Sequence, residues 1–147
     1  MLTISAETLK ALEAHGESAY PAEGAGLLFG TNNGDGNKTV ADILPLANRW
    51  EAEEQYHRFL ITPPDMLRGE QAAARRGLEV IGVFHSHPDH PAEPSGFDRD
   101  WALPFYSYII TTVEKGAATR SRSWLLKEDR SAYDEETIQS IERLTKL

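Results

Sequence analysis

The segment Glu79–His87 is the most constraining feature of this 147-residue chain, because it has the pattern of a buried strand that ends in two histidines. Pro88 ends the strand, since proline cannot donate a hydrogen bond to a sheet ladder. Residues two apart on a strand share a face, so His85 and His87 point the same way, about 6.7 Å apart along the strand. Any fold of this chain must therefore carry two imidazoles together at the C-terminal end of a core strand.

A serine and an aspartate follow the histidines at short range. The loop 89–94 turns the chain back, Ser95 is placed to cap a helix, and Asp98 falls in the first turn of that helix. A lone His-x-His pair is usually a solvated or structurally satisfied pair, but the added Ser and Asp favour a metal site. His90, in the loop, stays open as an alternative ligand.

The histidines and the aspartate together predict a catalytic metal site. His85, His87 and Asp98 are three ligands of the type that zinc prefers, and the fourth tetrahedral position is left for water. We therefore expect one Zn²⁺ per chain, with iron and manganese as the alternatives.

Composition narrows the function classes. The chain has no cysteine, which excludes disulfides, cysteine-type zinc fingers, iron–sulfur clusters and thiol catalysis. A zinc nucleoside deaminase, which normally uses cysteine ligands, is disfavoured for the same reason. The net charge of −8 argues against binding nucleic acid through its phosphates. The sequence has no apolar run long enough for a membrane span and no signal-peptide pattern at its start, so we expect a cytoplasmic protein.

Helical and strand patterns alternate along the rest of the chain. Ser5 is expected to cap a first helix that runs to about Ala19, and Thr62 to begin a second helix that Gly77 ends. The stretch 32–37 predicts a hairpin loop, and the polar segment 47–58 an exposed loop. Other strands are expected at Gly26–Gly30, Thr39–Leu46, Tyr106–Val113 and Arg120–Lys127, and a terminal helix at Asp134–Lys146 with Ile138, Ile141 and Leu144 on one stripe.

This order of elements predicts a single domain over residues 1–147 of the α/β (mixed α+β) class. Its core would be a central mixed sheet with hairpins, flanked by about three helices.

A hydrolase also needs a base, and Glu23 is the candidate. It stands just before the apolar strand at Gly26–Gly30, beside glycines that allow close backbone approach. Composition alone does not choose between Glu23 and three other acidic residues: Glu53, Glu54 and Glu93.

At these positions the sequence resembles the JAMM (MPN-plus) zinc metallopeptidase family, in its small stand-alone prokaryotic form. The family signature is matched by Glu23, His85-Ser86-His87-Pro88, Ser95 and Asp98. Seven residues separate His87 from Ser95 and two separate Ser95 from Asp98, as in the family. The likeness extends from residue 2 to 126, and Ala25 replaces a non-catalytic cysteine that many members carry.

The resemblance implies a JAMM/MPN-like (cytidine-deaminase-like) fold and a role for each motif residue. His85, His87 and Asp98 would bind zinc, Glu23 would act as general base and then acid, and Ser95 would donate to the oxyanion. Ser95 as a helix cap alone is the plainer alternative. Ser86, on the opposite strand face, is interpreted as structural. Trp101, Phe105 and Tyr106 would either wall the cleft or pack in the core.

The resemblance also implies the substrate class. Family members cleave peptide or isopeptide bonds after the C-terminal Gly-Gly of ubiquitin or ubiquitin-like proteins. Small stand-alone bacterial members are associated with ubiquitin-like sulfur-carrier proteins and remove residues or an amino acid from the C-terminus of the carrier. For this chain we therefore favour a sulfur-carrier protein with a Gly-Gly tail as partner. The alternatives are a deconjugating isopeptidase acting on lysine-linked modifiers, and a non-catalytic module that binds ubiquitin-like tails. Neither a nucleic acid nor a membrane is expected as partner, and the oligomeric state is left open.

Overall fold

The strand that carries the two histidines lies at the centre of the protein. A computed structural model describes residues 1–142, in which β4 (Glu79–Pro88) pairs with β2 antiparallel and with β5 parallel. Both neighbours belong to an eight-stranded mixed sheet with the order β7-β6-β5-β4-β2-β3-β1-β8. The other strands are β1 (Leu2–Ser5), β2 (Ala25–Gly34), β3 (Asn37–Leu46), β5 (Ser107–Glu114), β6 (Ala117–Leu126), β7 (Tyr133–Glu136) and β8 (Ile138–Ile141).

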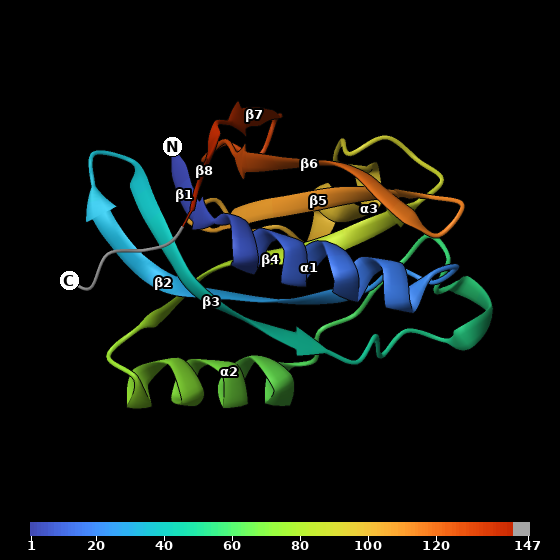
Figure 1. Cartoon of the computed structure of the whole chain (residues 1–147), viewed down its shortest axis with the longest axis horizontal. Coiled ribbons are helices and arrows are strands. Elements are labelled where there is room, and N and C mark those ends of the chain that lie inside the picture. The colour runs from blue at the N-terminus through green and yellow to red at the C-terminus, as the bar shows by residue number, and fades with distance from the viewer. Residues whose placement is uncertain (143–147) are drawn as a thin grey trace.

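Two longer helices cover different sides of the sheet, as Figure 1 shows. Helix α1 (Ala6–Ala19) begins at Ser5, whose side chain accepts a hydrogen bond from the Thr8 N–H. Helix α2 (Pro63–Arg75) begins at Thr62 in the same way, and Gly77 follows its end with a φ of +70°. Both helices confirm the expected caps, because N-cap bonding depends only on residues within one turn.

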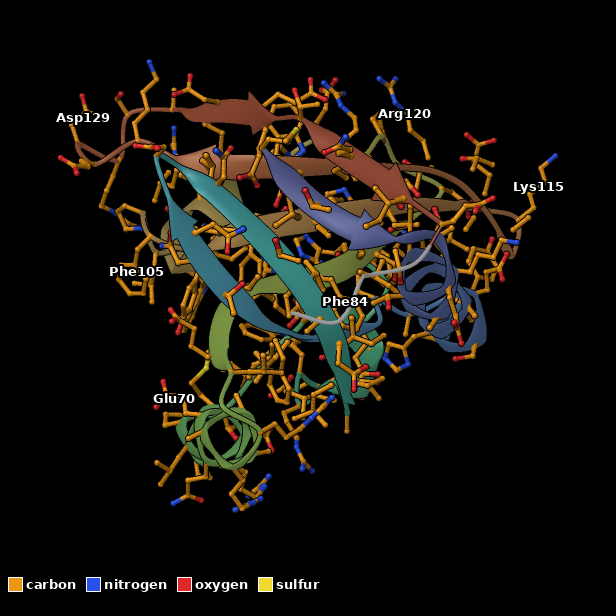
Figure 2. All side chains as sticks on the ribbon, turned by 60° about the vertical axis from the view of Figure 1, so that its left-hand side comes forward. Glu70, Phe84, Phe105, Lys115, Arg120 and Asp129 are labelled. Atoms are coloured by element: carbon orange, nitrogen blue, oxygen red, sulfur yellow. The ribbon has the colours of Figure 1, made fainter. Side chains whose placement is uncertain are left out.

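Alternation along the central strands divides the core between these helices. Leu28 and Phe84 pack with Leu12 on the α1 side, and Figure 2 shows Phe84 in the interior of the molecule. Leu27 and Val83 face the α2 side, where Ala73 covers them. Successive residues of a strand point to opposite faces, so β2 and β4 are apolar on both faces and sit in the middle of the sheet. The result is a single α+β domain, as the sequence predicted.

The hairpin between β2 and β3 is tighter than expected. The strands extend to Gly34 and Asn37, so the turn needs only Asp35 and Gly36. Both residues have positive φ, 53° and 77°, which is the requirement of the commonest two-residue hairpin turn. The loop predicted over 32–37 is therefore mostly strand.

The terminal helix predicted at Asp134–Lys146 is wrong over the described residues, and residues 143–147 lie outside them. Strand β7 pairs antiparallel with β6, and β8 pairs parallel with β1. Residues 133–141 thus connect the two edges of the sheet, and their backbone groups are satisfied by edges that would otherwise stay unpaired. Tertiary pairing overrides the helical spacing of Ile138 and Ile141.

The first residues form a further strand that sequence reasoning missed. Leu2 and Ile4 are fully buried in β1, which lies between β3 and β8. No helix within residues 1–142 is long and apolar enough to cross a bilayer. The cytoplasmic setting stays a prediction.

Candidate metal centre

The two histidines meet at the C-terminal end of β4, on the face of the sheet that carries Val83. The Nε2 atoms of His85 and His87 are 3.2 Å apart, and both side chains are buried. The Nδ1 of His87 lies 2.8 Å from the Pro91 carbonyl oxygen, which can only accept. Nδ1 of His87 therefore carries the proton, and its Nε2 presents a lone pair toward His85. Phe59 stacks on the other ring, with centroids 4.5 Å apart, and fixes the plane of His85.

Asp98 approaches the same point from α3 (Gly96–Trp101). Its carboxylate oxygens lie 3.3 Å from Nε2 of His85 and 3.1 Å from Nε2 of His87. Ser95 and Asp98 cap this helix reciprocally: the Asp98 N–H donates to the Ser95 hydroxyl, and the Ser95 N–H donates to the Asp98 carboxylate. The first turn of α3 therefore holds the carboxylate against the histidines, where the sequence placed it.

Glu23 completes the cluster from the turn before β2. Its side chain is buried, and its ligand oxygen lies within 4.8 Å of ligand nitrogens of both histidines. One carboxylate oxygen, Oε1, has no hydrogen-bond partner among the described residues. On the opposite face of β4, the Ser86 hydroxyl accepts a 2.8 Å hydrogen bond from the Gly24 N–H. The side chain between the two histidines thus anchors the turn that carries Glu23, in line with the structural role expected for Ser86.

The surroundings of the two carboxylates shift their pKa values in opposite directions. Burial raises the pKa of Glu23 to about 8, with His87 opposing the shift and Asp98 adding to it. Burial by itself would also raise the pKa of Asp98, but the two histidines outweigh it and hold that pKa well below its ordinary value. Burial lowers the pKa of the His85 ring. At neutral pH, Asp98 is an anion, and His85 is a neutral ring that can give a lone pair to a metal ion. Glu23 can gain or lose a proton at that pH.

The donor set fits a tetrahedral divalent metal ion. Two ligands with bonds of about 2.0–2.1 Å to such an ion lie about 3.3–3.4 Å from each other. The separations among His85, His87 and Asp98 are 3.1–3.3 Å. Two imidazole lone pairs and a carboxylate face one point, and buried polar atoms beside them have no hydrogen-bond partner among the described residues. The buried His-His-Glu cluster, with Asp98 next to it, is therefore a candidate metal site.

The competing sequence candidates do not join this cluster. The His90 backbone carbonyl accepts from Thr112, and the residue is exposed. Glu54 accepts from the Trp50 indole at 3.0 Å, and Glu93 pairs with Arg122 at 3.1 Å. Glu53 is exposed on a short 3₁₀ turn. Of the four acidic candidates for the base, the fold brings only Glu23 to the histidines.

Sequence reasoning interpreted the segment 47–58 as an exposed loop, left the role of residues 47–60 open, and did not predict that this segment holds the backbone of Glu23. The backbone carbonyl of Gln55 accepts a hydrogen bond from the Glu23 N–H at 2.6 Å, and the side-chain amide of Asn48 donates to the Glu23 carbonyl at 3.0 Å. The exposed residues of the segment are 47, 49, 51–53 and 56, while Asn48 and Gln55 are half-buried. The single available signal was an amide among charged residues, which does not identify a distant partner.

Two hollows flank the metal site. One, of about 110 Å³, is largely apolar and is lined by His85, Asp98, Phe59, Ile61, Trp101 and Tyr106, among others. We name the other the polar hollow; its volume is about 400 Å³, and it is lined by Glu23, His57, Arg58, His87, His90, Pro91, Glu93, Pro94, Ser95 and Phe97.

Of the three aromatic residues that follow the metal motif, two line the apolar hollow and the third takes neither expected role. Tyr106 is buried and lines the apolar hollow. Trp101 also lines it but is 59% exposed. Phe105 lies outside both hollows, and Figure 2 shows it at the edge of the molecule.

A buried His-His-Asp-Glu arrangement at the end of a central strand, on an α+β sheet, defines a candidate metallohydrolase. The chain belongs to the family described as prokaryotic homologs of the JAB domain, whose model matches residues 5–127.

Two named relatives are similar to this chain in sequence. A desampylase of Pyrococcus furiosus is 31% identical over 111 residues, covering 76% of this chain and 71% of that protein. A probable TtuB-protein conjugate cleaving protease of Thermus thermophilus is 31% identical over 100 residues, covering 66% of this chain and 62% of that protein.

Solved structures show the same fold. A protein from Desulfitobacterium hafniense is 33% identical with a TM-score of 0.85, covering 98% of this chain and 95% of its own. A JAB1/MPN domain protein from Archaeoglobus fulgidus, 21% identical, has a TM-score of 0.59 over 95% of this chain and 98% of its own. The likeness to the latter concerns the fold alone.

Proposed function

We propose that this chain is a zinc metallopeptidase that hydrolyses the bond after the C-terminal Gly-Gly of a ubiquitin-like protein. The observation that carries the proposal is the convergence of His85, His87 and Asp98 within 3.3 Å of one another, beside the buried carboxylate of Glu23. The names of the two relatives support the substrate class, since both refer to the cleavage of protein conjugates.

In this proposal His85, His87 and Asp98 hold one zinc ion. When bound, the ion would supply a Lewis acid for the scissile carbonyl and lower the pKa of a water. Two imidazoles and one carboxylate are a donor set that suits zinc, although iron and manganese accept the same groups.

Glu23 moves the proton. A carboxyl group whose pKa is raised to about 8 by burial accepts a proton from the attacking water and can then give it up to the leaving amine. Water adds to the carbonyl carbon, the carbon–nitrogen bond breaks, and the water's proton ends on the amine. The anchoring of both the N–H and the carbonyl of Glu23 keeps its carboxylate in place through both transfers.

Ser95 is able to cap the helix and to bind the developing oxyanion. Its hydroxyl oxygen accepts from the Asp98 N–H, which uses a lone pair and leaves the hydroxyl proton free to donate. The residue is exposed toward the polar hollow, where a substrate carbonyl would arrive. Removing one such donor elsewhere typically costs about 100- to 1,000-fold in rate.

The favoured partner is a sulfur-carrier protein with a Gly-Gly tail. Glycine has no side chain, so a Gly-Gly segment is the one most easily threaded past Phe59 and Ser95 to a buried ion. The competing substrate is a lysine-linked conjugate, which shares the same scissile carbonyl.

The test is metal content together with cleavage. Protein purified without a chelator or a histidine tag is expected to contain about one zinc per chain, and Asp98→Asn to lose most of it. A carrier extended by a few residues beyond Gly-Gly should be cut after the second glycine. Full zinc loading without cleavage of extended carriers or of lysine-linked conjugates would reject the enzyme and favour the tail-binding module.

A further inference from the structure

Arg58 is the cationic side chain of the polar hollow, and the mechanism above does not use it. Its guanidinium lies 5.6 Å from the centroid of the Trp50 ring and 5.3 Å from that of Phe97. The two rings pack edge-to-face at 5.3 Å, so they form a rigid seat for a planar cation. Phe97 is two residues after Ser95, which places this seat beside the oxyanion donor.

The charge of Arg58 is only weakly neutralised. Within residues 1–142 its one ion pair is with Glu54, at 4.0 Å, and Glu54 already accepts the Trp50 indole N–H at 3.0 Å. At 4.0 Å the Nη1 atom of Arg58 is beyond hydrogen-bond length from the Glu54 carboxylate, and the buried Nε has no hydrogen-bond partner among those residues. The outer nitrogens of the guanidinium therefore keep donors available for an anionic group that enters the hollow.

Other charged groups around the hollow do not remove this preference. Glu93 is held by Arg122, which also binds Glu135. His57 and His90 add nitrogen donors to the lining. Glu23 is the remaining acid, and it is committed to the reacting atoms.

The fold also links Arg58 to Glu23. The same Asn48 amide nitrogen donates to the Glu23 carbonyl at 3.0 Å and to the Arg58 carbonyl at 2.8 Å. Glu23 must reach the leaving nitrogen, so the leaving group lies on its side of the metal site, in the polar hollow. An anionic group carried a short distance beyond the scissile nitrogen would then meet the guanidinium.

We propose that Arg58 binds the α-carboxylate of a short leaving group and so sets a preference for scissile bonds close to a free C-terminus. This inference rests on the proposed function and narrows it: the bond cut is a peptide bond near a free C-terminus. The products are the carrier ending in Gly-Gly and a free amino acid or short peptide. A lysine in a folded conjugate offers no α-carboxylate there and is cut less efficiently.

The experiment compares two tail peptides that differ at one group. Both carry one residue after Gly-Gly, one with a free carboxylate and the other with a C-terminal carboxamide. For the zinc-loaded wild type we expect kcat/KM to favour the carboxylate roughly 10- to 100-fold, as expected for a charge-assisted pair. Arg58→Gln should bring this ratio close to one, and Arg58→Lys should keep part of it.

Arg75→Gln is the matched control, because Arg75 is an exposed arginine of α2 outside both hollows. It should leave the ratio at the wild-type value. Equal cleavage of the two peptides by the wild type, or an unchanged ratio in Arg58→Gln, would overturn the inference and leave the proposed function standing.

A second readout does not need turnover. In a zinc-loaded Glu23→Gln background, calorimetry should show tighter binding of the carboxylate peptide, and loss of that preference when Arg58→Gln is added. If no peptide or conjugate is cut by the zinc-loaded wild type, the proposed function fails, and this affinity ratio still decides whether Arg58 recognises a carboxylate.

Discussion

The side-chain amide of Asn48 donates a hydrogen bond to the backbone carbonyl of Glu23 at 3.0 Å. Asn48 uses its other end as well: its carbonyl oxygen accepts the N–H groups of Trp50 and Leu60. One side chain therefore ties the segment that follows β3 into a closed loop and presses it against the candidate base. A residue outside the candidate metal ligands thus helps to position the carboxylate that we propose as the proton carrier.

Replacing this amide should reduce turnover without removing the metal. Asn48→Asp keeps the shape but turns the donor into an acceptor facing two carbonyl oxygens. We expect a loss of about 1–3 kcal/mol in unfolding free energy, from the buried acceptors left unpaired, and a fall in kcat larger than the change in KM. Urea unfolding and steady-state kinetics measure both. Normal kinetics in a destabilised Asn48→Asp protein would mean that Asn48 acts on stability alone.

Removing the base should separate metal binding from chemistry. Glu23→Gln is nearly isosteric and keeps the backbone bonds to Gln55 and Asn48. We expect zinc content near the wild-type value and a fall in kcat of about 100- to 10,000-fold, the usual contribution of general acid–base catalysis. Elemental analysis and single-turnover cleavage test this together. Loss of zinc in Glu23→Gln would instead make Glu23 a ligand of the ion.

A methyl group at Gly82 should destabilise the centre of the sheet. A Cβ there would lie 2.1 Å from the backbone carbonyl oxygen of Ser107 on β5, which cannot move without breaking the β4–β5 ladder. Gly82→Ala is expected to lose about 3 kcal/mol or more in unfolding free energy. Gly96→Ala is the control, since a Cβ at Gly96 meets no atom within 4 Å. A urea midpoint for Gly82→Ala equal to that of the control would contradict the packing shown.

Asp65 should make stability depend on acid pH. Its hydrogen bond with Arg49 is the main cause of a lowered pKa in the folded state, against the opposing effect of burial, and Arg68 pairs with it as well. A folded-state pKa below the unfolded value of about 3.8 stabilises the protein above that pH, and the gain is lost as pH falls through the lowered pKa.

The comparison is between the wild type and Asp65→Asn in urea from pH 7 to pH 3. The wild type should be more stable by a constant amount down to about pH 5, and the difference should then shrink. Asp42→Asn breaks only the exposed pair with Arg76 and should change the midpoint little. A difference for Asp65→Asn that does not vary with pH would assign the effect to packing rather than to charge.

The local elements were predictable because their determinants are neighbours in the chain. Alternation placed His85 and His87 on one strand face, and the cap at Ser95 placed Asp98 in a first turn. Ser86 was correctly assigned to the other face, but its partner, the Gly24 N–H, was not visible from the sequence. The two residues are 62 positions apart in the chain, and the stretch between them carries no pattern that records this contact.

The errors have the same origin. Residues 134–141 have a helical spacing of apolar side chains, yet they form β7 and β8 because two sheet edges offer unpaired backbone groups. Backbone pairing accepts almost any side chain, so an edge in the fold outweighs a weak local preference. The segment 47–58 was misjudged because Glu51 and Glu53 do face solvent, while Asn48 and the backbone carbonyl of Gln55 bind the backbone of Glu23.

The sequence by itself predicted the candidate metal ligands and the family, since these depend on residue type and short spacing. Tertiary structure decided that Glu23, and none of Glu53, Glu54 or Glu93, meets the histidines, and that Arg58 shares its hollow. Tertiary structure also decided that the last two described strands, β7 and β8, lie at opposite edges of the sheet. The physical reason is that hydrogen bonds and close packing between distant segments depend on geometry, which no local pattern of side chains encodes.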